Sequence, residues 1–165
     1  VPPTVAIVGA PNVGKSTIAN RLFEQQRSIE ADLPGTTRDW IGEPANLDGL
    51  AVTLIDTPGQ RASAGAIEQR AIQTSGRIIA RAELVVVVLD GSIHPSGATD
   101  ALLDRYPGAL VVVNKSDRLL QDADWPTEAV FVSARIGQGI ERLRRAIRRR
   151  FVPDAIDPTV PRRLP

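Results

Sequence analysis

A glycine-rich run near the start of the chain, residues 9–16 (GAPNVGKS), has the spacing of a phosphate-binding loop. Its glycines let successive backbone N–H groups point inward at an anion, and a following helix adds partial positive charge at its amino end. We expect Lys15 to reach the outer phosphates of a nucleotide and to assist catalysis there, and the Ser16 hydroxyl to ligate Mg²⁺. The other predicted contacts of this loop are Asn12, Val13, Gly14 and Thr17.

A second short pattern, Asp56-Thr57-Pro58-Gly59, directly follows an apolar run. A carboxylate at the carboxyl end of a strand beside the phosphate loop can hold the Mg²⁺ shell through water, and the Gly59 N–H can meet the γ-phosphate. The pattern recurs by chance, so only its place behind a phosphate loop makes it informative. We therefore expect Asp56 near the metal and Gly59 near the terminal phosphate.

The segment Asn114-Lys115-Ser116-Asp117 follows the apolar run 110–113 and has the groups needed to read guanine. Guanine presents an N1–H and an N2 amino group side by side, and the Asp117 carboxylate can accept from both. Adenine has no such pair, so the carboxylate separates GTP from ATP. We expect the Lys115 stem to cover the base and Asn114 to tie this segment to the phosphate loop; the alternative is an ordinary polar turn.

Three residues after the last short apolar run are expected to close over the guanine with backbone N–H groups; they are Ser133, Ala134 and Arg135. This tripeptide is nonspecific by itself. The chain has only two lysines among its 20 basic residues, Lys15 and Lys115, and both fall within the predicted nucleotide motifs. Their scarcity could reflect composition, but composition does not explain their places.

Composition restricts the remaining possibilities. The chain has 165 residues and no cysteine, which allows one domain with a real core and excludes disulfides and thiolate metal sites. No apolar run approaches ~20 residues, so we expect no membrane span and favour a cytoplasmic protein. The chain begins with Val1 and contains no methionine, and we interpret it as a segment of a longer protein.

The elements that must position these motifs alternate along the chain. Apolar β-rich runs at 4–8, 51–55, 84–89, 110–113 and 130–132 suit a parallel sheet covered on both faces, and 40–47 predicts a strand entering a hairpin at Asp48-Gly49. Helices are predicted at 16–25, 66–80 and 139–151. The expected fold class is α/β, with a nucleotide-binding domain over 1–151 and a proline-rich linker over 152–165.

Charge is uneven, because seven of the basic residues are arginines within 135–151. The last predicted helix places Ile140, Leu143, Ile147 and Phe151 on one side, and we expect its arginines to fill the other. Such a face could bind RNA or a ribosome, but we favour an arginine-rich solvated surface, since arginine dominates the whole chain.

The motifs in this order resemble the TrmE–Era–EngA family of GTPases, and are closest to its tRNA-modification members, called MnmE or TrmE. The resemblance covers about Thr4 to Phe151 and rests on PNVGKS, GTTRD at 35–39, DTPG, NKSD and SARIGQGI from 133. It implies a P-loop NTPase fold, a three-layer sandwich with a six-stranded, mostly parallel sheet and one antiparallel strand. It also implies Mg²⁺-dependent hydrolysis of GTP to GDP and phosphate.

The long polar segment 27–39 precedes the hairpin and suits a loop ordered by GTP and released after hydrolysis. The resemblance implies that Thr37 is its Mg²⁺-ligating threonine. It further implies that Asn12, Thr36 and the carbonyls of 31–36 hold a K⁺ against the phosphates, in place of an arginine finger, when two such domains form a transient homodimer.

Two residues compete for orienting the attacking water. Relatives carry a glutamate in this region of the chain, which Glu68 matches, whereas Gln60 stands where Ras-like GTPases place a glutamine. The alternative for Glu68 is a solvated residue at a helix start, where a glutamate is favourable in any case. The alternatives to a tRNA-modification protein are an Era- or EngA-like ribosome-assembly GTPase, with RNA or ribosome bound through other domains, and a nucleotide-binding module with negligible hydrolysis.

Overall fold

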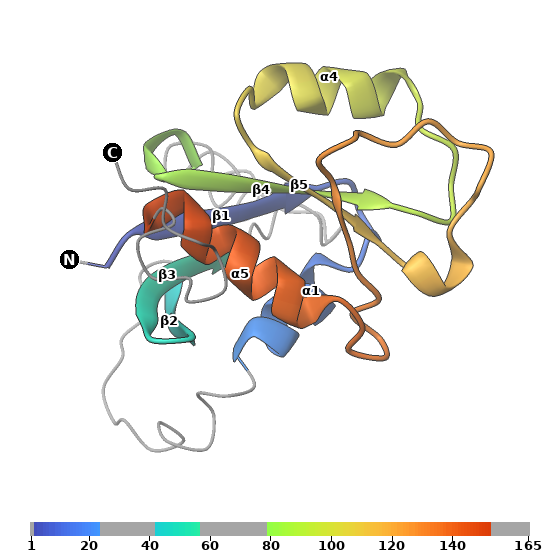
Figure 1. Cartoon of the computed structure of the whole chain (residues 1–165). Helices are drawn as coiled ribbons and strands as arrows, with labels where there is room; N and C mark the ends of the chain where they lie inside the picture. Colours follow the sequence, from blue (N-terminus) through green and yellow to red (C-terminus); the bar gives the residue numbers. More distant parts are fainter. Residues whose placement is uncertain (1, 24–41, 57–78, 153–165) are drawn as a thin grey trace, which may run out of the picture.

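The computed structural model describes residues 2–23, 42–56 and 79–152. Within them lies a six-stranded sheet in the order β2-β3-β1-β4-β5-β6 (Figure 1). Its strands are β1 (Thr4–Gly9), β2 (Gly42–Leu47), β3 (Leu50–Asp56), β4 (Leu84–Asp90), β5 (Leu110–Asn114) and β6 (Val130–Phe131). Only β2 runs antiparallel, beside β3. The predicted fold class is therefore confirmed.

A tight hairpin joins β2 to β3 at the predicted Asp48-Gly49 pair. Both residues have positive φ, 52° and 94°, which matches the turn that suits the right-handed twist of paired strands. The Asn46 side chain accepts a hydrogen bond from the Gly49 N–H at 2.7 Å. Local chemistry alone was sufficient to predict this connection.

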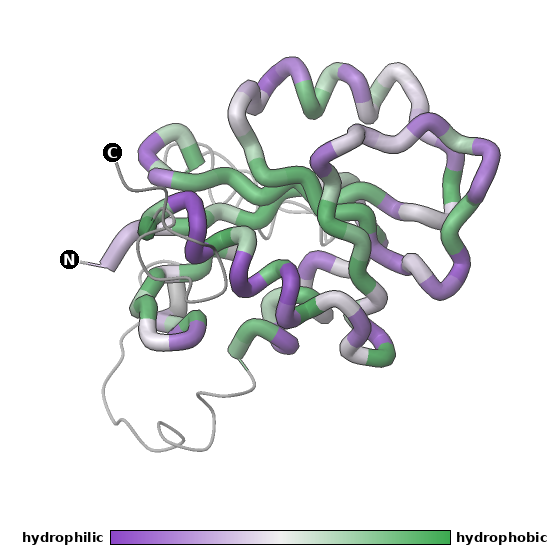
Figure 2. The backbone as a smooth tube through the Cα atoms, viewed as in Figure 1, coloured by the Kyte–Doolittle hydropathy of each residue, from purple (hydrophilic) through white to green (hydrophobic). Residues whose placement is uncertain are grey.

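The sheet is the middle of three layers. Helices α1 (Lys15–Phe23) and α5 (Ile140–Phe151) cover one face, and α4 (Gly97–Arg105) covers the other (Figure 1). Two apolar clusters follow from this arrangement, one under α1 and α5 and a smaller one beside α4. Because both faces are covered, β1 and β4 are apolar along nearly their whole length, as the green central strands of Figure 2 show.

Helix α4 was not predicted from the sequence. None of its residues is buried, and only Leu102 and Leu103 pack against the smaller cluster, so the apolar period is too weak to indicate a helix. Its first turn is stabilised locally, because the Ser96 N–H donates to Thr99 Oγ1 at 3.2 Å. A short 3-10 helix, η1 (Ser116–Arg118), was also missed.

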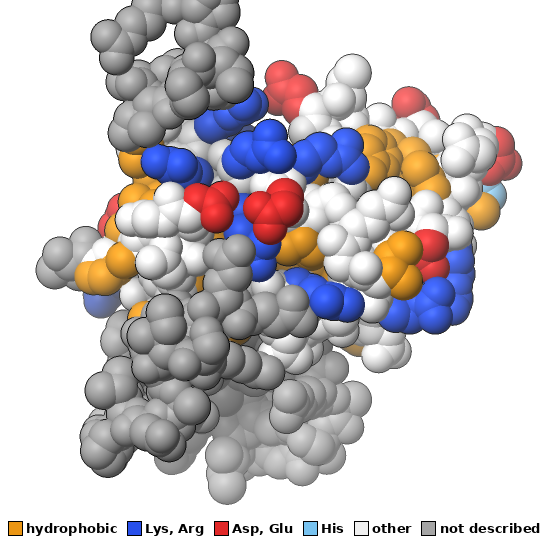
Figure 3. Space-filling model, turned by 60° about the horizontal axis from the view of Figure 1, so that its bottom comes forward, with side chains coloured by type: hydrophobic (Ala, Val, Ile, Leu, Met, Phe, Trp, Pro, Cys, Tyr) orange, Lys and Arg blue, Asp and Glu red, His pale blue; other side chains and the backbone are white. Residues whose placement is uncertain are grey.

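Helix α5 confirms the predicted apolar side and corrects the prediction for the other. Ile140, Leu143 and Ile147 are buried against the sheet, as expected. Exposed arginines contribute to the basic side chains gathered on the face that Figure 3 shows. The expectation that all the arginines face solvent is wrong for Arg144, which is only 5% exposed, since it reaches across to α1.

Several predicted elements lie outside the described residues: the loop at 27–39, most of the helix at 66–80, and the linker from 153 onward. In the part of the chain that the structure describes, no helix is long and apolar enough to cross a membrane.

Candidate nucleotide-binding site

The carboxyl ends of four parallel strands bring the motif residues to one edge of the sheet. The phosphate loop follows β1, Asp56 ends β3, Asp90 ends β4 and Asn114 ends β5. Strand β1 lies inside the sheet. The next parallel strand along the chain, β3, pairs with one side of β1, and β4 pairs with the other side. Ligands of open α/β sheets bind at such a topological switch point.

The phosphate loop takes its shape from backbone conformation. Asn12 and Gly14 have left-handed φ angles of 65° and 96°, and the Gly14 carbonyl accepts the first helical hydrogen bond, from Ile18 N–H at 3.0 Å. A Cβ at Gly14 would lie 2.2 Å from Asn114 Nδ2, so glycine is needed for the close approach as well as for the angle. The loop therefore depends on Gly14 in two independent ways.

Lys15 is the first residue of α1, and its side chain folds over the loop. It is 7% exposed, and its Nζ donates to the carbonyl of Gly9 at 2.9 Å and to that of Ala10 at 3.4 Å. Ser16 and Thr17 follow it, both exposed, at the amino end of the helix. An ammonium, a hydroxyl and a helix N-terminus thus converge where a phosphate chain would be recognised.

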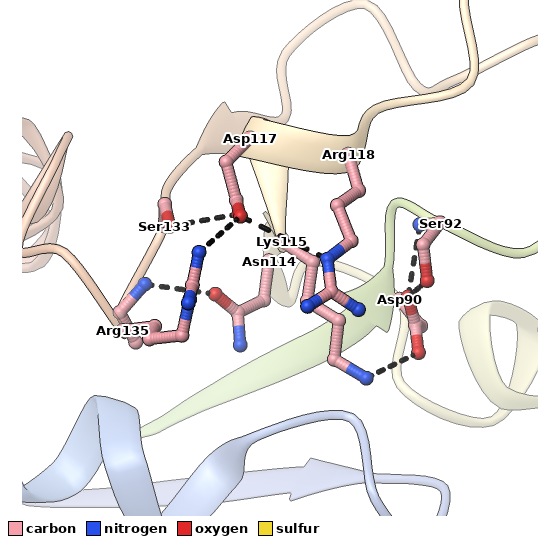
Figure 4. Close-up of polar contacts among 9 residues, drawn as sticks. Asp90, Ser92, Asn114, Lys115, Asp117, Arg118, Ser133 and Arg135 are labelled. Carbon is pink, nitrogen blue, oxygen red and sulfur yellow. Dashed lines mark hydrogen bonds and ion pairs between the residues drawn. The ribbon is translucent and has the colours of Figure 1, made fainter.

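Asn114 connects the two halves of the site. It is 3% exposed, its Nδ2 donates to the Val13 carbonyl at 2.9 Å, and its Oδ1 accepts from the Ala134 N–H at 3.1 Å. The predicted tie to the phosphate loop is present, and a second tie to the segment after β6 accompanies it (Figure 4). One amide side chain therefore sets the spacing between the phosphate and base regions.

Asp117 presents its carboxylate beside the segment after β6. Ser133 Oγ donates to one of its oxygens at 2.9 Å, and the Arg135 guanidinium donates to the other at 3.3 Å (Figure 4). These hydrogen bonds, that of Ser133 above all, lower the pKa of Asp117 and outweigh a smaller desolvation. The group is an anionic acceptor at neutral pH, as guanine recognition requires.

Lys115 is held by a residue that the sequence analysis missed. Its backbone is left-handed at φ 61°, and its Nζ donates to Asp90 Oδ2 at 2.8 Å and to the Asn12 carbonyl at 3.0 Å. Ser92 donates twice to the other Asp90 oxygen, from N–H at 2.9 Å and from Oγ at 2.6 Å. Burial opposes ionisation of Asp90, but the Lys115 and Ser92 hydrogen bonds prevail and lower its pKa.

A sequence signal for Asp90 did exist. It stands directly after the apolar run 84–89, the same position relative to its strand that Asp56 and Asn114 occupy. A polar residue at the carboxyl end of a parallel strand is a site candidate on topology alone.

The backbone amides expected to close over guanine are already partly used within the protein. Ser133 N–H donates to the Gln138 carbonyl at 2.8 Å, and Ala134 N–H donates to Asn114. Within the part of the chain that the structure describes, the Arg135 N–H donates to no protein group. Of the three amides, that of Arg135 is the one without an acceptor among the described residues, and the contact of all three with guanine stays a prediction.

The remaining predicted site residues cannot be placed beside these. Asp56 is described only as the last residue of β3, where its backbone is in register with Ile7 of β1. The others lie outside the described residues and stay predictions: Thr36, Thr37, Gly59, Gln60 and Glu68. A cavity of about 520 Å³ lies at the opposite edge of the sheet, lined in part by Leu84, Ala109 and Arg150, and is therefore separate from this site.

This fold and this geometry define a guanine-nucleotide-binding P-loop domain. Residues 4–115 match the sequence model of the 50S ribosome-binding GTPases, and the chain belongs to that family. It is accordingly a GTP hydrolase.

Curated relatives narrow the comparison. The chain is 42% identical over 151 residues to a tRNA modification GTPase MnmE of Nitratidesulfovibrio vulgaris (strain DP4), covering 87% of this chain and 33% of that protein. It is 38% identical over 154 residues to an MnmE of Xanthomonas campestris pv. campestris (strain B100), covering 92% and 34%. The chain thus spans about a third of the length of these relatives. They support the MnmE-like interpretation over the Era-like one.

Solved structures share the fold. Era of Aquifex aeolicus bound to GDP·AlF4⁻ superposes with a TM-score of 0.65 at 23% identity, covering 96% of this chain and 59% of that one. The FeoB G-domain of Methanococcus jannaschii gives 0.60 at 25% identity, covering 89% and 96%.

Proposed function

We propose that this domain binds GTP with the phosphates on residues 12–17 and the base on Asp117, and hydrolyses it with Mg²⁺. The observation that supports this most is Asn114, whose two hydrogen bonds join the phosphate loop to the base-reading segment. If the glycine-rich loop matched the phosphate-loop pattern only by chance, we would not expect a buried side chain to connect it to the segment beside a carboxylate that suits guanine.

Oxygen donors suit the proposed metal site. Ser16 and Thr37 would ligate Mg²⁺ directly, and Asp56 would do so through water; hydroxyl, carboxylate and water oxygens are the ligands this hard cation prefers. When bound, Mg²⁺ neutralises charge on the β- and γ-phosphate oxygens. When a nucleotide binds, Lys15 Nζ would leave the Gly9 and Ala10 carbonyls and donate to the β- and γ-phosphate oxygens instead.

The catalytic proposal extends to the water and to K⁺. Glu68 would position the attacking water, with Gln60 as the alternative, and Gly59 would contact the γ-phosphate. Asn12 and Thr36 would hold K⁺ between two copies of the domain. The support for this step is the resemblance of the motifs to potassium-activated relatives and the exposed position of Asn12 at the phosphate loop.

For the longer protein we propose a role in tRNA modification, because the relatives named above are tRNA modification GTPases. Such a role would place the protein in the cytoplasm, and RNA would be bound through parts of the protein beyond this chain. Ribosome assembly remains the second candidate, favoured by the name of the matching family.

Single-turnover GTP hydrolysis in K⁺ and in Na⁺, across a range of protein concentrations, tests the proposal. We expect hydrolysis to require Mg²⁺, to weaken in Ser16→Ala and to be at least about tenfold faster in K⁺, since an arginine finger is worth roughly 10³ to 10⁵. Hydrolysis indifferent to EDTA would refute the metal assignment. Equal rates in both salts at high concentration would remove K⁺ activation and leave the GTP site intact.

The Asn12 variant requires care because its backbone is left-handed. Asn12→Gly removes the side chain without adding strain, whereas alanine would add it. We expect this variant to lose the K⁺ effect and to retain GDP binding.

A further inference from the structure

Arg21 connects the helix that begins at the phosphate loop with the segment that follows β6. Its Nε donates to the Ala134 carbonyl at 2.7 Å, and its NH2 donates to the Arg135 carbonyl at 2.7 Å. The planar guanidinium therefore binds two successive backbone carbonyls at once, and the first of them lies 113 residues away in the sequence. On the same side, a Cβ at Gly137 would lie 3.5 Å from Arg21 NH1, so the loop packs closely on this side chain.

These two hydrogen bonds determine the direction of one backbone N–H group. A trans peptide is planar, so its C=O and N–H point in opposite directions, and no described peptide is cis. Because the Ala134 carbonyl is directed at Arg21, the N–H of the next residue, Arg135, is directed away from it. Among the three amides expected at the base, this is the one without an acceptor in the described part of the protein, whereas those of Ser133 and Ala134 are engaged.

Helix α5 contacts Arg21 in turn, at its backbone carbonyl. Arg144 NH2 donates to the Arg21 carbonyl at 2.7 Å, and its other terminal nitrogen pairs with Glu141. The Arg21 carbonyl belongs to the last turn of α1, where carbonyls lack intrahelical partners and a cation is favourable. Helix α5 thus anchors the end of α1, and α1 anchors the loop.

The chemistry of the base indicates what the Arg135 amide can meet. Asp117 suits the donor edge of guanine, N1–H and the N2 amino group, and the atom next to N1 on the ring carries the 6-keto acceptor. Both Ser133 and Arg135 are hydrogen-bonded to Asp117, so their loop lies against that carboxylate. A backbone donor in this loop would therefore lie near the 6-keto oxygen of a guanine bound to Asp117.

We propose that Arg21 is a positioning residue for guanine recognition, fixing the 134–135 peptide so that the Arg135 N–H meets the 6-keto oxygen. This inference rests on the proposed GTP function. A lysine could hold only one carbonyl at a time and would orient the peptide less firmly.

The test compares Arg21→Ala and Arg21→Lys in the 165-residue chain. The control is Arg145→Ala, an exposed α5 arginine with no hydrogen bond or ion pair among the described residues. Each variant is titrated with GDP, IDP and the diphosphate of 2-aminopurine riboside, which lacks the 6-keto oxygen and the N1–H; each nucleotide is therefore compared with its own affinity for the wild type. We expect Arg21→Ala to weaken GDP and IDP by about three- to tenfold, the worth of one neutral hydrogen bond. The 2-aminopurine nucleotide should change less than about twofold, and Arg21→Lys should be intermediate.

The titrations distinguish failure of the positioning role of Arg21 from failure of the proposed GTP function. An equal loss for all three nucleotides, or no loss for GDP, would overturn the positioning role. A wild type that binds none of them would refute the proposed function instead. Thermal unfolding checks the fold of each variant, and if Arg21→Ala does not fold, the nucleotide selectivity of Arg21→Lys decides.

Discussion

The two ends of the nucleotide site are built in different ways. The phosphate end is one contiguous segment, residues 9–17, shaped by backbone conformations at Asn12 and Gly14. The base end is assembled from the ends of separate strands, with Asp90, Asn114 and Asp117 held by side-chain hydrogen bonds. The phosphate loop thus takes its shape mainly from local backbone conformation, whereas the groups proposed to read the base come together only once the sheet has formed.

The largest expected effect lies at the base end. Asp117→Asn removes the acceptor of two guanine donors, so GDP affinity should fall by about 10³-fold, because a site built around a polar pair rejects a mismatched partner strongly. Affinity for xanthosine diphosphate, whose 2-position is an oxygen, should rise. Titration of both nucleotides measures the change, with Asp104→Asn on α4 as an exposed control. Unaltered selectivity would mean that Asp117 does not read the base.

The phosphate end should be most sensitive at Gly14. Gly14→Ala combines a left-handed φ with a Cβ 2.2 Å from Asn114 Nδ2, and should lower the free energy of unfolding by about 3 kcal/mol. Gly49→Ala is the matched control, since its φ is 94° but nothing lies within 4 Å, and should cost about 1 kcal/mol. Urea unfolding measures both. Equal costs would show that strain alone matters and that the contact with Asn114 does not.

Asn114→Ala tests whether this side chain couples the two ends. It leaves the Val13 carbonyl and the Ala134 N–H without their partner, and should cost about 2 kcal/mol of unfolding free energy. In this background Gly14→Ala should cost no more than Gly49→Ala, because the clashing atom is gone. Strict additivity of the two substitutions in urea unfolding would contradict the close approach.

The smallest expected effect is at Asp90. Asp90→Asn weakens the hold on Lys115 and should cost about 1 kcal/mol at pH 7. The folded pKa of Asp90 is lowered, so its stabilisation is complete above the unfolded pKa near 3.9 and is lost as pH falls through the folded value. The difference between wild type and variant should therefore shrink below about pH 4. A gap in unfolding free energy that stays constant down to pH 2 would exclude this role of the carboxylate.

Predictions from the sequence succeeded where the deciding interactions are local. The phosphate loop, the Asp48-Gly49 hairpin and the buried strands are each specified by a few neighbouring residues, through backbone preferences and apolar patterning. Helix α4 was missed because it buries no side chain completely and so has little apolar period.

By itself, then, the sequence determined the class of fold and the phosphate loop, and it supplied the proposal that the Asp117 carboxylate reads guanine. Only the tertiary structure decided which groups hold them in place: Asp90 for Lys115, Asn114 for both halves, and the chain from Arg144 through Arg21 to the loop after β6. The physical reason is distance along the chain, because Arg21 meets Ala134 across 113 residues and Arg144 meets Arg21 across 123. An arginine on a helix has the same sequence pattern whether it faces water or grips a carbonyl, and packing alone distinguishes the two.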